Sequence, residues 1–312
     1  MHVAVMGAGA VGCYYGGMLA RAGHSVTLIA RPAHVEAIRA RGLRLQTTRF
    51  DEHVTLQASD SASVVANADV VLFCVKSSDT ESAGALMQAH LRADALVLSL
   101  QNGVDNAQRL SGVLGREVIP TVVYVGTGMV GPGHVQHFGR GELVLGDAPA
   151  SASLAKTLSE ADVPSTVSTN VAGALWTKLI INCAYNAASA ITQLPYGRLV
   201  EQAGMWATMR QAYEECVAVA MTSGVTLDAP VWPMIEAIAQ SMGGQHSSTA
   251  QDLQKGKPTE IDHLNGYVVR RAAAHGLPAP ANRQRTYLSH VPQRCTISLL
   301  PGAAADFHHL CA

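Results

Sequence analysis

The chain has 312 residues, of which 48% are hydrophobic, and its formal net charge is −1. This length predicts about two domains, and the composition excludes a disordered chain. The near balance of acidic and basic residues gives no electrostatic reason to expect a nucleic acid or an anionic membrane as partner, and leaves room for a local positive site that binds a small anion.

The N-terminus is apolar, but no basic segment precedes it and six glycines interrupt it between Gly7 and Gly23. We therefore expect a first strand and helix there rather than a signal peptide. No uninterrupted apolar run approaches the roughly 20 residues that span a bilayer. None of the six cysteines forms a C-x-x-C pair, which argues against a zinc site or a disulfide framework. We expect a soluble, cytoplasmic protein with reduced thiols and no metal site.

Short apolar runs alternate with helical patterns in the first half of the chain. We expect strands at residues 2–6, 25–30, 69–75, 95–100 and, less cleanly, 117–125, with helices at 10–22, 79–90 and 104–110. The run DVVLFCV at 69–75 is typical of a strand that is buried on both faces. Alternation of this kind predicts an α/β fold with a parallel, doubly wound sheet.

The pattern changes after residue 125. Residues 126–146 contain seven glycines and one proline, and we expect them to form antiparallel strands or hairpins that finish the sheet. After Pro164 we expect no further strand, and helices at residues 171–191, 201–223, 229–241 and 259–275. This organisation predicts a Rossmann dinucleotide-binding domain at 1–168 and an all-helical domain at 169–312.

The segment GAGAVG, residues 7–12, follows the first expected strand and opens the first expected helix. In that context the G-x-G-x-x-G pattern predicts a dinucleotide site. Its first glycine permits a tight turn, its second lets the backbone approach a pyrophosphate, and its third lets helix and strand pack closely. The pyrophosphate would lie at the positive end of the helix dipole. The alternative is a glycine-rich turn without a ligand. The residues expected to bind the cofactor here are Gly7, Gly9, Ala10, Val11 and Gly12.

The end of the second expected strand indicates which dinucleotide binds. An NAD enzyme usually places Asp or Glu there to hold the ribose 2′-hydroxyl, but this strand ends Leu-Ile-Ala and is followed by Arg31. A guanidinium pairs with a 2′-phosphate, whereas a carboxylate would repel it. We therefore predict NADPH as the cofactor, the alternative being that Arg31 is an ordinary surface residue.

Two loops after later strands are expected to face the same cleft, because ligands bind beyond the carboxyl ends of the strands. One loop carries Lys76, which could reach a cofactor phosphate or an anionic substrate. The other carries Asn102, whose amide is expected near the nicotinamide. A solvated lysine and a plain Asn-Gly turn are the alternatives.

The helix expected at 171–191 carries Lys178, Asn182 and Asn186 at spacings of four residues, so that the three side chains share one face. Most other residues of this helix are apolar or small, and burying a lysine and two amides among them is costly unless they are paired. This pattern favours a functional site over a solvated polar stripe. Further on, Pro258 is well placed to start a helix with Glu260 in its first turn, where a helix dipole favours a carboxylate. A purely structural capping glutamate is the alternative.

The segments GAGAVG, CVKS around Lys76, LQNGVDN around Asn102, LWTKLIINCAYN around Lys178 and SSTAQDLQKGKPTEIDHLNGYV around Glu260 occur together in this order. In that combination the chain resembles the ketopantoate reductase (2-dehydropantoate 2-reductase) family over residues 1 to 282. The resemblance implies a Rossmann domain, a helical domain and an oxidoreductase that uses NADPH to reduce ketopantoate to pantoate, in pantothenate and coenzyme A biosynthesis.

Carried over by position, the resemblance implies that Lys178 is the general acid that protonates the substrate carbonyl, with Glu260 hydrogen-bonded near it. A fixed ammonium would stabilise the negative charge that hydride addition builds on the oxygen, and a lysine with an ordinary pKa of about 10.4 starts protonated. The residues that would hold or orient the substrate are Asn102, Asn182, Asn186 and Ser248.

Two alternatives share the fold: a reductase of another branched 2-keto acid, and a non-catalytic protein that binds or senses NADPH. The chain is expected to be a monomer or a homodimer. The family usually ends in an amphipathic helix, whereas the tail after about residue 283 has poor helical periodicity, two further prolines and the adjacent pair His308 and His309. This tail departs from the usual pattern and is expected to be either a divergent terminus or a different structure. We assign it no metal, because adjacent side chains on a helix point apart.

Overall fold

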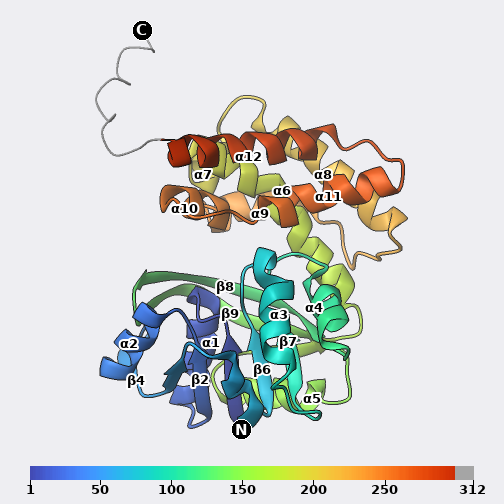
Figure 1. The fold of residues 1–312 in the computed structure, drawn as a ribbon. Helices are drawn as coiled ribbons and strands as arrows, with labels where there is room; N and C mark the ends of the chain where they lie inside the picture. The colour runs from blue at the N-terminus through green and yellow to red at the C-terminus, as the bar shows by residue number, and fades with distance from the viewer. Residues whose placement is uncertain (299–312) are drawn as a thin grey trace, which may run out of the picture. The chain divides into compact units, whose positions relative to one another are not determined.

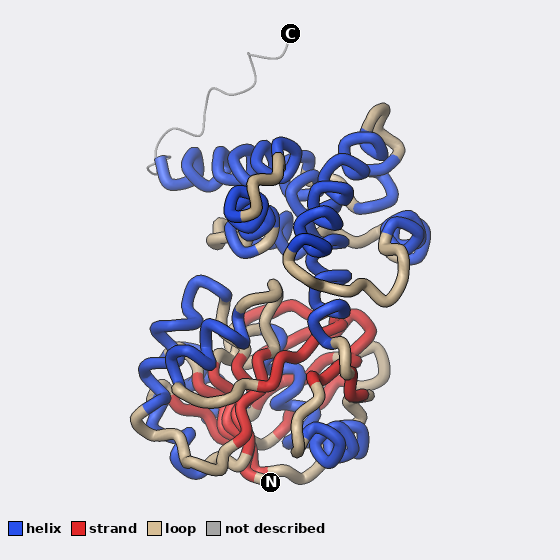
Figure 2. The backbone as a smooth tube through the Cα atoms, turned by 90° about the vertical axis from the view of Figure 1, so that its right-hand side faces the viewer, coloured by secondary structure: helices blue, strands red, loops and turns tan. Residues whose placement is uncertain are grey.

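The structure of the chain is a computed structural model, which describes the backbone of residues 1–298 and the side chains of residues 1–290. The chain divides into two compact units, Met1–Leu175 and Trp176–Ala312. The described strands belong to the first unit, and the described part of the second unit is helical (Figures 1 and 2). This confirms the predicted fold class. The predicted domain boundary, between residues 168 and 169, lies at the end of the last strand.

The first unit is built on a parallel sheet with the strand order β5-β2-β1-β6-β7-β8. These strands are β1 (His2–Met6), β2 (Ser25–Ile29), β5 (Gln57–Ser59), β6 (Val70–Phe73), β7 (Leu96–Ser99) and β8 (Ile119–Gly131). All four residues of β6 are buried, as the apolar run predicted. Because β1 has β2 on one side and β6 on the other, the strand order changes direction beside β1. Doubly wound sheets bind ligands at such a switch point, beyond the carboxyl ends of the strands.

The glycine-rich segment forms one long antiparallel hairpin of β8 with β9 (His134–Gly146), in which three register shifts interrupt the pairing. Beyond it the sheet continues through β3 (Leu43–Gln46) to β4 (Asp51–Val54). The expectation that no strand follows Pro164 is wrong. Strand β10 (Ser165–Ser168) pairs in parallel with β9. Its sequence, Ser-Thr-Val-Ser, lacks an apolar run because none of its residues is fully buried, so its strand character comes from the pairing with β9.

Five helices and two short 3-10 helices complete the described part of the first unit. Helix α1 is buried along most of its length, and α3 and α4 pack against each other. The elements are α1 (Ala10–Arg21), α2 (Pro32–Arg41), η1 (Ala62–Asn67), η2 (Ser77–Asp79), α3 (Thr80–Gln88), α4 (Asn106–Leu114) and α5 (Ser151–Glu160).

The second unit is organised around α6, whose residues from Cys183 to Ala190 are all buried. A network of side chains joins the later helices to it. Glu215 accepts hydrogen bonds from the backbone amides of Ala281 (2.8 Å) and Asn282 (2.9 Å). Asn265 donates to the Asn282 side chain (2.8 Å) and to the Cys183 carbonyl (3.1 Å). The helices are α6 (Val171–Thr192), α7 (Tyr196–Val200), α8 (Met205–Thr222), α9 (Trp232–Ser241), α10 (Ser248–Gln254), η3 (Ile261–His263), α11 (Asn265–Ala274) and α12 (Pro280–Ser298).

The prediction of one helix over residues 259–275 is wrong. Residues 257–260 are extended or irregular, and Glu260 precedes the single turn of η3 rather than lying in the first turn of an α-helix. Leu264 then takes φ −108° and ψ −100°, which is not helical, and α11 starts only after it. The interruption has a tertiary cause, because the buried Asn265 side chain is held by α6 and α12 at the start of α11.

Of the two possibilities for the tail, the divergent terminus holds up to Ser298, because α12 continues there through Pro292. The helix showed poor periodicity in the sequence because its buried face is polar. Asn282, Arg285, Thr286 and Ser289 are each at most 7% exposed, and they follow the i, i+3, i+4, i+7 spacing of one helix face. The rest of the tail, with His308 and His309, lies outside the described residues.

Candidate active site

In the glycine-rich turn between β1 and α1, each glycine of the motif lacks a side chain for a different physical reason. Gly7 has φ +97°, and a Cβ there would lie 2.8 Å from the backbone nitrogen of Val75. At Gly12 a Cβ would collide with the Gly7 carbonyl oxygen and lie 2.8 Å from Cγ1 of Val5. A Cβ at Gly9 would meet no protein atom within 4 Å. Packing therefore explains Gly7 and Gly12, and leaves the space beside Gly9 open.

Gly9 is the N-cap residue of α1, and no side chain caps the helix. The first turn contains no acidic residue, and the first backbone hydrogen bond of the helix runs from Cys13 to Gly9 (2.8 Å). The amide groups of the first turn thus have no partner within the helix, and the helix dipole adds positive potential there. This arrangement fits the pyrophosphate of a dinucleotide, for which Gly9 leaves room.

Arg31 follows the end of β2 and is the N-cap residue of α2. Its side chain is exposed, and the first turn of α2 contains no acidic residue. The neighbouring Ala30 amide donates to the Ser59 carbonyl (2.9 Å), which fixes the end of β2 against β5. The position where an NAD enzyme usually carries a carboxylate is therefore apolar here and is followed by a cation, which fits a 2′-phosphate.

Lys76 and Asn102 lie in the loops that follow the neighbouring strands β6 and β7, and Lys76 is exposed whereas Asn102 is half-buried. Hydrogen bonds join the two loops. Ser77 Oγ donates to the Asn102 carbonyl (3.1 Å), and Gln101 Nε2 donates to the Val75 carbonyl (3.2 Å). The sequence singled out Lys76 and Asn102 but missed their neighbours Ser77 and Gln101. The only available signal was that both are polar residues directly beside the two candidates.

A half-buried histidine, His34, lies beside Cys13 of α1 and was not identified from the sequence. His34 of α2 accepts a hydrogen bond at Nδ1 from the Gly133 amide (2.7 Å), and its Nε2 lies 3.2 Å from Cys13 Sγ. Since Nδ1 accepts, the neutral ring carries its proton on Nε2. Burial lowers the pKa of His34 and raises the pKa of the Cys13 thiol. Both groups are therefore neutral near pH 7, and the thiol is no nucleophile.

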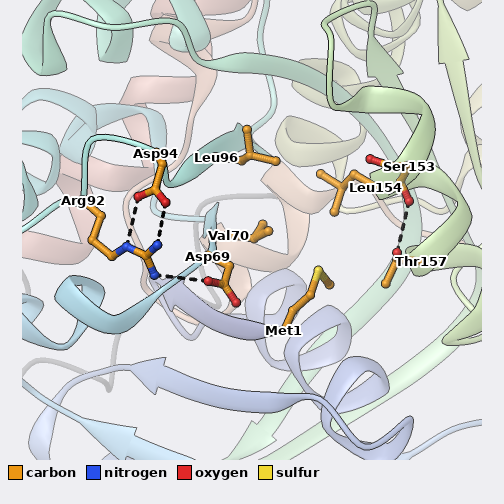
Figure 3. Close-up of a pocket in the computed structure, with 9 residues that line it drawn as sticks. All are labelled: Met1, Asp69, Val70, Arg92, Asp94, Leu96, Ser153, Leu154 and Thr157. Carbon is orange, nitrogen blue, oxygen red and sulfur yellow. Dashed lines mark hydrogen bonds and ion pairs between the residues drawn. The ribbon is translucent and has the colours of Figure 1, made fainter.

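The described residues contain a cavity of about 260 Å³ whose lining includes Met1, Asp69, Arg92, Asp94 and Thr157 (Figure 3). Several of these residues precede strands, so the cavity lies at the amino ends of β1, β6 and β7, opposite the glycine-rich turn. The Arg92 guanidinium pairs with Asp94 (2.6 Å) and Asp69 (3.2 Å), which neutralise it. The cavity therefore lies at the wrong edge of the sheet for the cofactor, and its arginine is already paired with two carboxylates.

In the second unit, Lys178, Asn182 and Asn186 lie on successive turns of α6, as their spacing predicted. Lys178 and Asn182 are half-buried, whereas Asn186 is only 2% exposed. These three side chains therefore share one face that runs from half-buried to buried. A polar stripe solvated along its whole length would expose all three side chains, and none of the three is in the exposed class.

The N-terminus of α10 is fastened to the same part of α6. Ser247 is fully buried, caps α10 by accepting from the Ala250 amide (3.0 Å), and donates to the Asn186 carbonyl (3.2 Å). Its own amide donates to Ser189 Oγ (3.2 Å). Ser248 is the first residue of α10 and is exposed. Because Ser248 directly follows Ser247, these bonds place the start of α10 beside Asn186. Ser247 is the anchoring residue that the sequence prediction missed.

Glu260 is half-buried and is the N-cap residue of η3. Two contacts hold the following segment beside α6: the rings of Trp176 and Tyr267 meet edge to face with centroids 6.0 Å apart, and Asn265 donates to the Cys183 carbonyl. Trp176 precedes Lys178 on α6 by two residues. The second unit thus carries Glu260 on a segment that packs against the part of α6 that contains Lys178.

Among the described residues no group of three or more His, Cys, Asp or Glu side chains has the arrangement of a metal site. Within the same range of the chain, no helix is both long enough and apolar enough to cross a membrane.

Comparison with known proteins relates this geometry to a family. The models for ketopantoate reductase PanE/ApbA and for its C-terminal part match residues 3–150 and 170–293. The 2-dehydropantoate 2-reductase of Halobacterium salinarum is 36% identical over 94% of this chain and 99% of its own. A crystal structure of a PanE/ApbA family ketopantoate reductase from Ralstonia eutropha is similar with a TM-score of 0.93 and 59% identity, covering 95% of this chain and 100% of that one.

A ternary structure of D-mandelate dehydrogenase with NADH and anilino(oxo)acetate is also similar, with a TM-score of 0.88 and 26% identity over 95% of this chain and 99% of that one. The family models cover most of the chain, and the curated relative matches along almost its whole length. The chain therefore belongs to the ketopantoate reductase family of oxidoreductases.

Proposed function

We propose that the protein reduces 2-dehydropantoate (ketopantoate) to pantoate with NADPH. The observation that carries the proposal is the half-buried Lys178 on the face of α6 that also presents Asn182 and the buried Asn186. The name shared by the curated relatives supplies the substrate. A protein that only senses NADPH needs no proton donor on such a face, so the lysine favours a catalyst.

NADPH as the cofactor is supported by the end of β2, where Arg31 stands in place of a carboxylate. The glycine-rich turn would hold the pyrophosphate through the amides of the first turn of α1. Lys76 lies beside the same edge of the sheet, where it would contact a phosphate or an anionic substrate. When bound, the cofactor supplies the hydride.

The proton is the contribution of the protein. Lys178 Nζ would donate it to the carbonyl oxygen of the keto acid, because hydride addition at C2 builds negative charge on that oxygen. Glu260 would hydrogen-bond near the lysine and help to orient it. Asn182, Asn186 and Ser248 would hold the hydroxyl and carboxylate groups of the substrate. Since α6 spaces Lys178, Asn182 and Asn186 rigidly, these three side chains are better preorganised than groups on a loop would be.

A second candidate is the reduction of a different 2-keto acid. The similarity to D-mandelate dehydrogenase favours considering it, because that enzyme acts on an aromatic 2-hydroxy acid with NADH. The chemistry of Lys178 would be the same for either substrate, and only the groups around C3 of the substrate and at the ribose 2′ position would differ.

The test is the oxidation of NADPH, followed by absorbance, with ketopantoate and with phenylglyoxylate as parallel substrates. Lys178→Ala is expected to lose about 10²–10⁴-fold in kcat. The exposed Lys156 of α5 provides the control, and Lys156→Ala should leave kcat unchanged. Turnover of phenylglyoxylate but not of ketopantoate would replace the first candidate by the second. NADPH binding without turnover of any 2-keto acid would refute both.

The cofactor preference has a separate test. Arg31→Ala is expected to weaken NADPH binding and to leave NADH binding almost unchanged, because only NADPH carries the 2′-phosphate. Loss of one charge-assisted contact corresponds to roughly tenfold to a hundredfold in Kd. Arg41→Ala, at the other end of α2, is the matched control and should have no effect on either cofactor. Equal losses for NADPH and NADH would contradict the assignment of Arg31.

A further inference from the structure

A cluster of polar side chains is buried between the loop that carries Lys76 and the loop that carries Asn102. Each of its members is at most 5% exposed. We call it the loop cluster, and it consists of Ser77, Thr80, Ser99, Gln101 and Asn106. Buried polar groups destabilise a fold unless they are hydrogen-bonded, so the partners of these side chains indicate what the cluster holds in place.

On one side the cluster fixes the peptide of Asn102. The Asn102 carbonyl accepts two hydrogen bonds, from Ser77 Oγ (3.1 Å) and from Asn106 Nδ2 (2.5 Å). The next residue, Gly103, has φ +97°, a conformation that favours glycine. The two donors and the glycine turn hold the Asn102 backbone in one orientation. This fixes the direction of its Cα–Cβ bond and so the position from which the side chain extends.

On the other side the cluster fixes both carbonyls that flank Lys76. Val75 O accepts from Gln101 Nε2 (3.2 Å). Ser77 O lies 3.1 Å from Thr80 Oγ1 and accepts from Arg109 Nη2 (2.9 Å). The backbone on each side of Lys76 is therefore held by groups that belong to the neighbouring loop and to the two helices that follow the loops.

Thr80 and Asn106 join the two sides. Thr80 Oγ1 accepts from Gln101 Nε2 (2.8 Å) and lies 3.1 Å from Asn106 Oδ1. Asn106 donates from Nδ2 to Ser77 Oγ (3.0 Å) and accepts at Oδ1 from Arg109 Nη1 (3.0 Å). The amide of Asn106 has one satisfactory orientation, because turning it over would set its oxygen against the Asn102 carbonyl and its NH₂ group against the guanidinium.

We propose that Asn106 and Thr80 are positioning residues that couple the Lys76 and Asn102 loops, so that both candidates for cofactor and substrate contact are placed together. The inference rests on the proposed function for the roles of Lys76 and Asn102. It follows from where the hydrogen bonds end. The cluster terminates on the carbonyls of residues 75, 77 and 102, which flank or belong to the two functional candidates, whereas a cluster that only stabilised the core would not need to end there.

Asn106→Asp tests the coupling with the smallest change in shape. The aspartate keeps an oxygen for Arg109 and Thr80, and it gains an ion pair with the guanidinium, so the protein should still fold. It replaces the donor to Asn102 O and Ser77 Oγ by an acceptor, so the Asn102 carbonyl loses Asn106 as a donor. A displacement of reacting groups of about 1 Å can cost a hundredfold in rate, and we expect kcat to fall about tenfold to a hundredfold.

Thr80 supplies the conservative pair and Thr121 the control. Thr80→Val should lower kcat in the same direction, and Thr80→Ser, which keeps the hydroxyl, should restore it. Thr121 of β8 is also buried (1% exposed), and its hydroxyl makes only a 3.4 Å bond to Ile119 O. Thr121→Val therefore removes a buried hydroxyl of the same domain outside the cluster and should leave kcat unchanged.

The readouts are kcat and KM, the melting temperature, NADPH affinity by fluorescence titration, and amide hydrogen exchange of residues 74–80 and 100–106. Lower kcat together with faster exchange in both loops, restored in Thr80→Ser, supports the proposal. A lower melting temperature with unchanged kcat, or faster exchange in the substituted loop alone, overturns it. If the wild-type protein shows no turnover, the proposed function fails, and exchange in the two loops decides the coupling by itself.

Discussion

Replacing Gly9 by alanine is expected to weaken NADPH binding without destabilising the fold, whereas the same replacement at Gly12 should impair both. Gly9 has φ −76° and ψ −167°, which alanine adopts freely, and its Cβ would meet no protein atom within 4 Å. Alanine is a poorer N-cap than glycine, which destabilises the protein. It also reduces the conformational entropy of the unfolded chain, which stabilises the protein by about 0.4–1 kcal/mol. These effects offset each other, so the melting temperature should hardly change.

The methyl group at residue 9 would instead occupy the space that the pyrophosphate needs. A charged group hydrogen-bonded to a backbone amide contributes about 1.5–3 kcal/mol, and losing one such bond raises Kd roughly tenfold to a hundredfold. At Gly12 the Cβ collides with a backbone oxygen, which cannot move like a side chain. Overpacking of this kind costs about 1–3 kcal/mol, and the rigid neighbour places Gly12→Ala at the upper end.

The assay is a fluorescence titration with NADPH beside thermal unfolding of each variant. Gly112, exposed in the interior of α4 with no atom within 4 Å of its Cβ position, gives the control. Gly112→Ala should stabilise the protein by about 0.5–1 kcal/mol and leave Kd unchanged. Wild-type NADPH affinity in Gly9→Ala would refute the placement of the pyrophosphate at α1. Wild-type stability in Gly12→Ala would refute the packing argument.

Three further outcomes follow from contacts outside the cofactor site. Glu215→Ala should lower the free energy of unfolding by about 2–4 kcal/mol in denaturant titration, since a carboxylate that binds the start of α12 is lost, and the exposed Glu214→Ala should not. Native protein at about pH 8 should leave Cys13 unmodified by iodoacetamide in peptide mass spectra, because burial raises its thiol pKa far above that pH. Burial lowers the pKa of His34, so below the unfolded value of about 6.5 the unfolded chain binds the extra proton, and the protein loses stability as the pH is lowered. His34→Asn should make the melting temperature fall less as the pH is lowered through this range.

The parallel core of the sheet could be predicted because its strands are short apolar runs, as at Val70–Phe73. The outer strands could not. Asp51–Val54 is mostly exposed and polar, and Ser165–Ser168 has no fully buried residue. Each of these strands is formed by pairing with a neighbouring strand, Asp51–Val54 with β3 and Ser165–Ser168 with β9. That pairing leaves no apolar pattern in the strand's own sequence.

The candidate site divides in the same way. Local sequence was enough for the glycine-rich turn and for the polar face of α6, because both depend on spacing within one element. The loop cluster was not predictable, since Ser77 and Asn106 are 29 residues apart and are common loop residues when viewed alone. Glu260 was assigned to a helix because Pro258 is a good start signal, whereas the anchored Asn265 sets the start of α11.

Helix α1 explains why the segment after the glycine motif is so rich in small residues. A helix that covers one face of a sheet usually keeps a polar outer face, but Gly12 to Leu19 are all buried. A Cβ at Gly16 would lie 2.7 Å from the Leu28 side chain of β2, and one at Gly17 would lie 3.1 Å from Leu43 of β3. The helix is thus enclosed by β2 on one side and by β3 on the other. The glycines let both layers approach it, and the outer strands thereby help to hold in place the helix whose N-terminus is the proposed phosphate site.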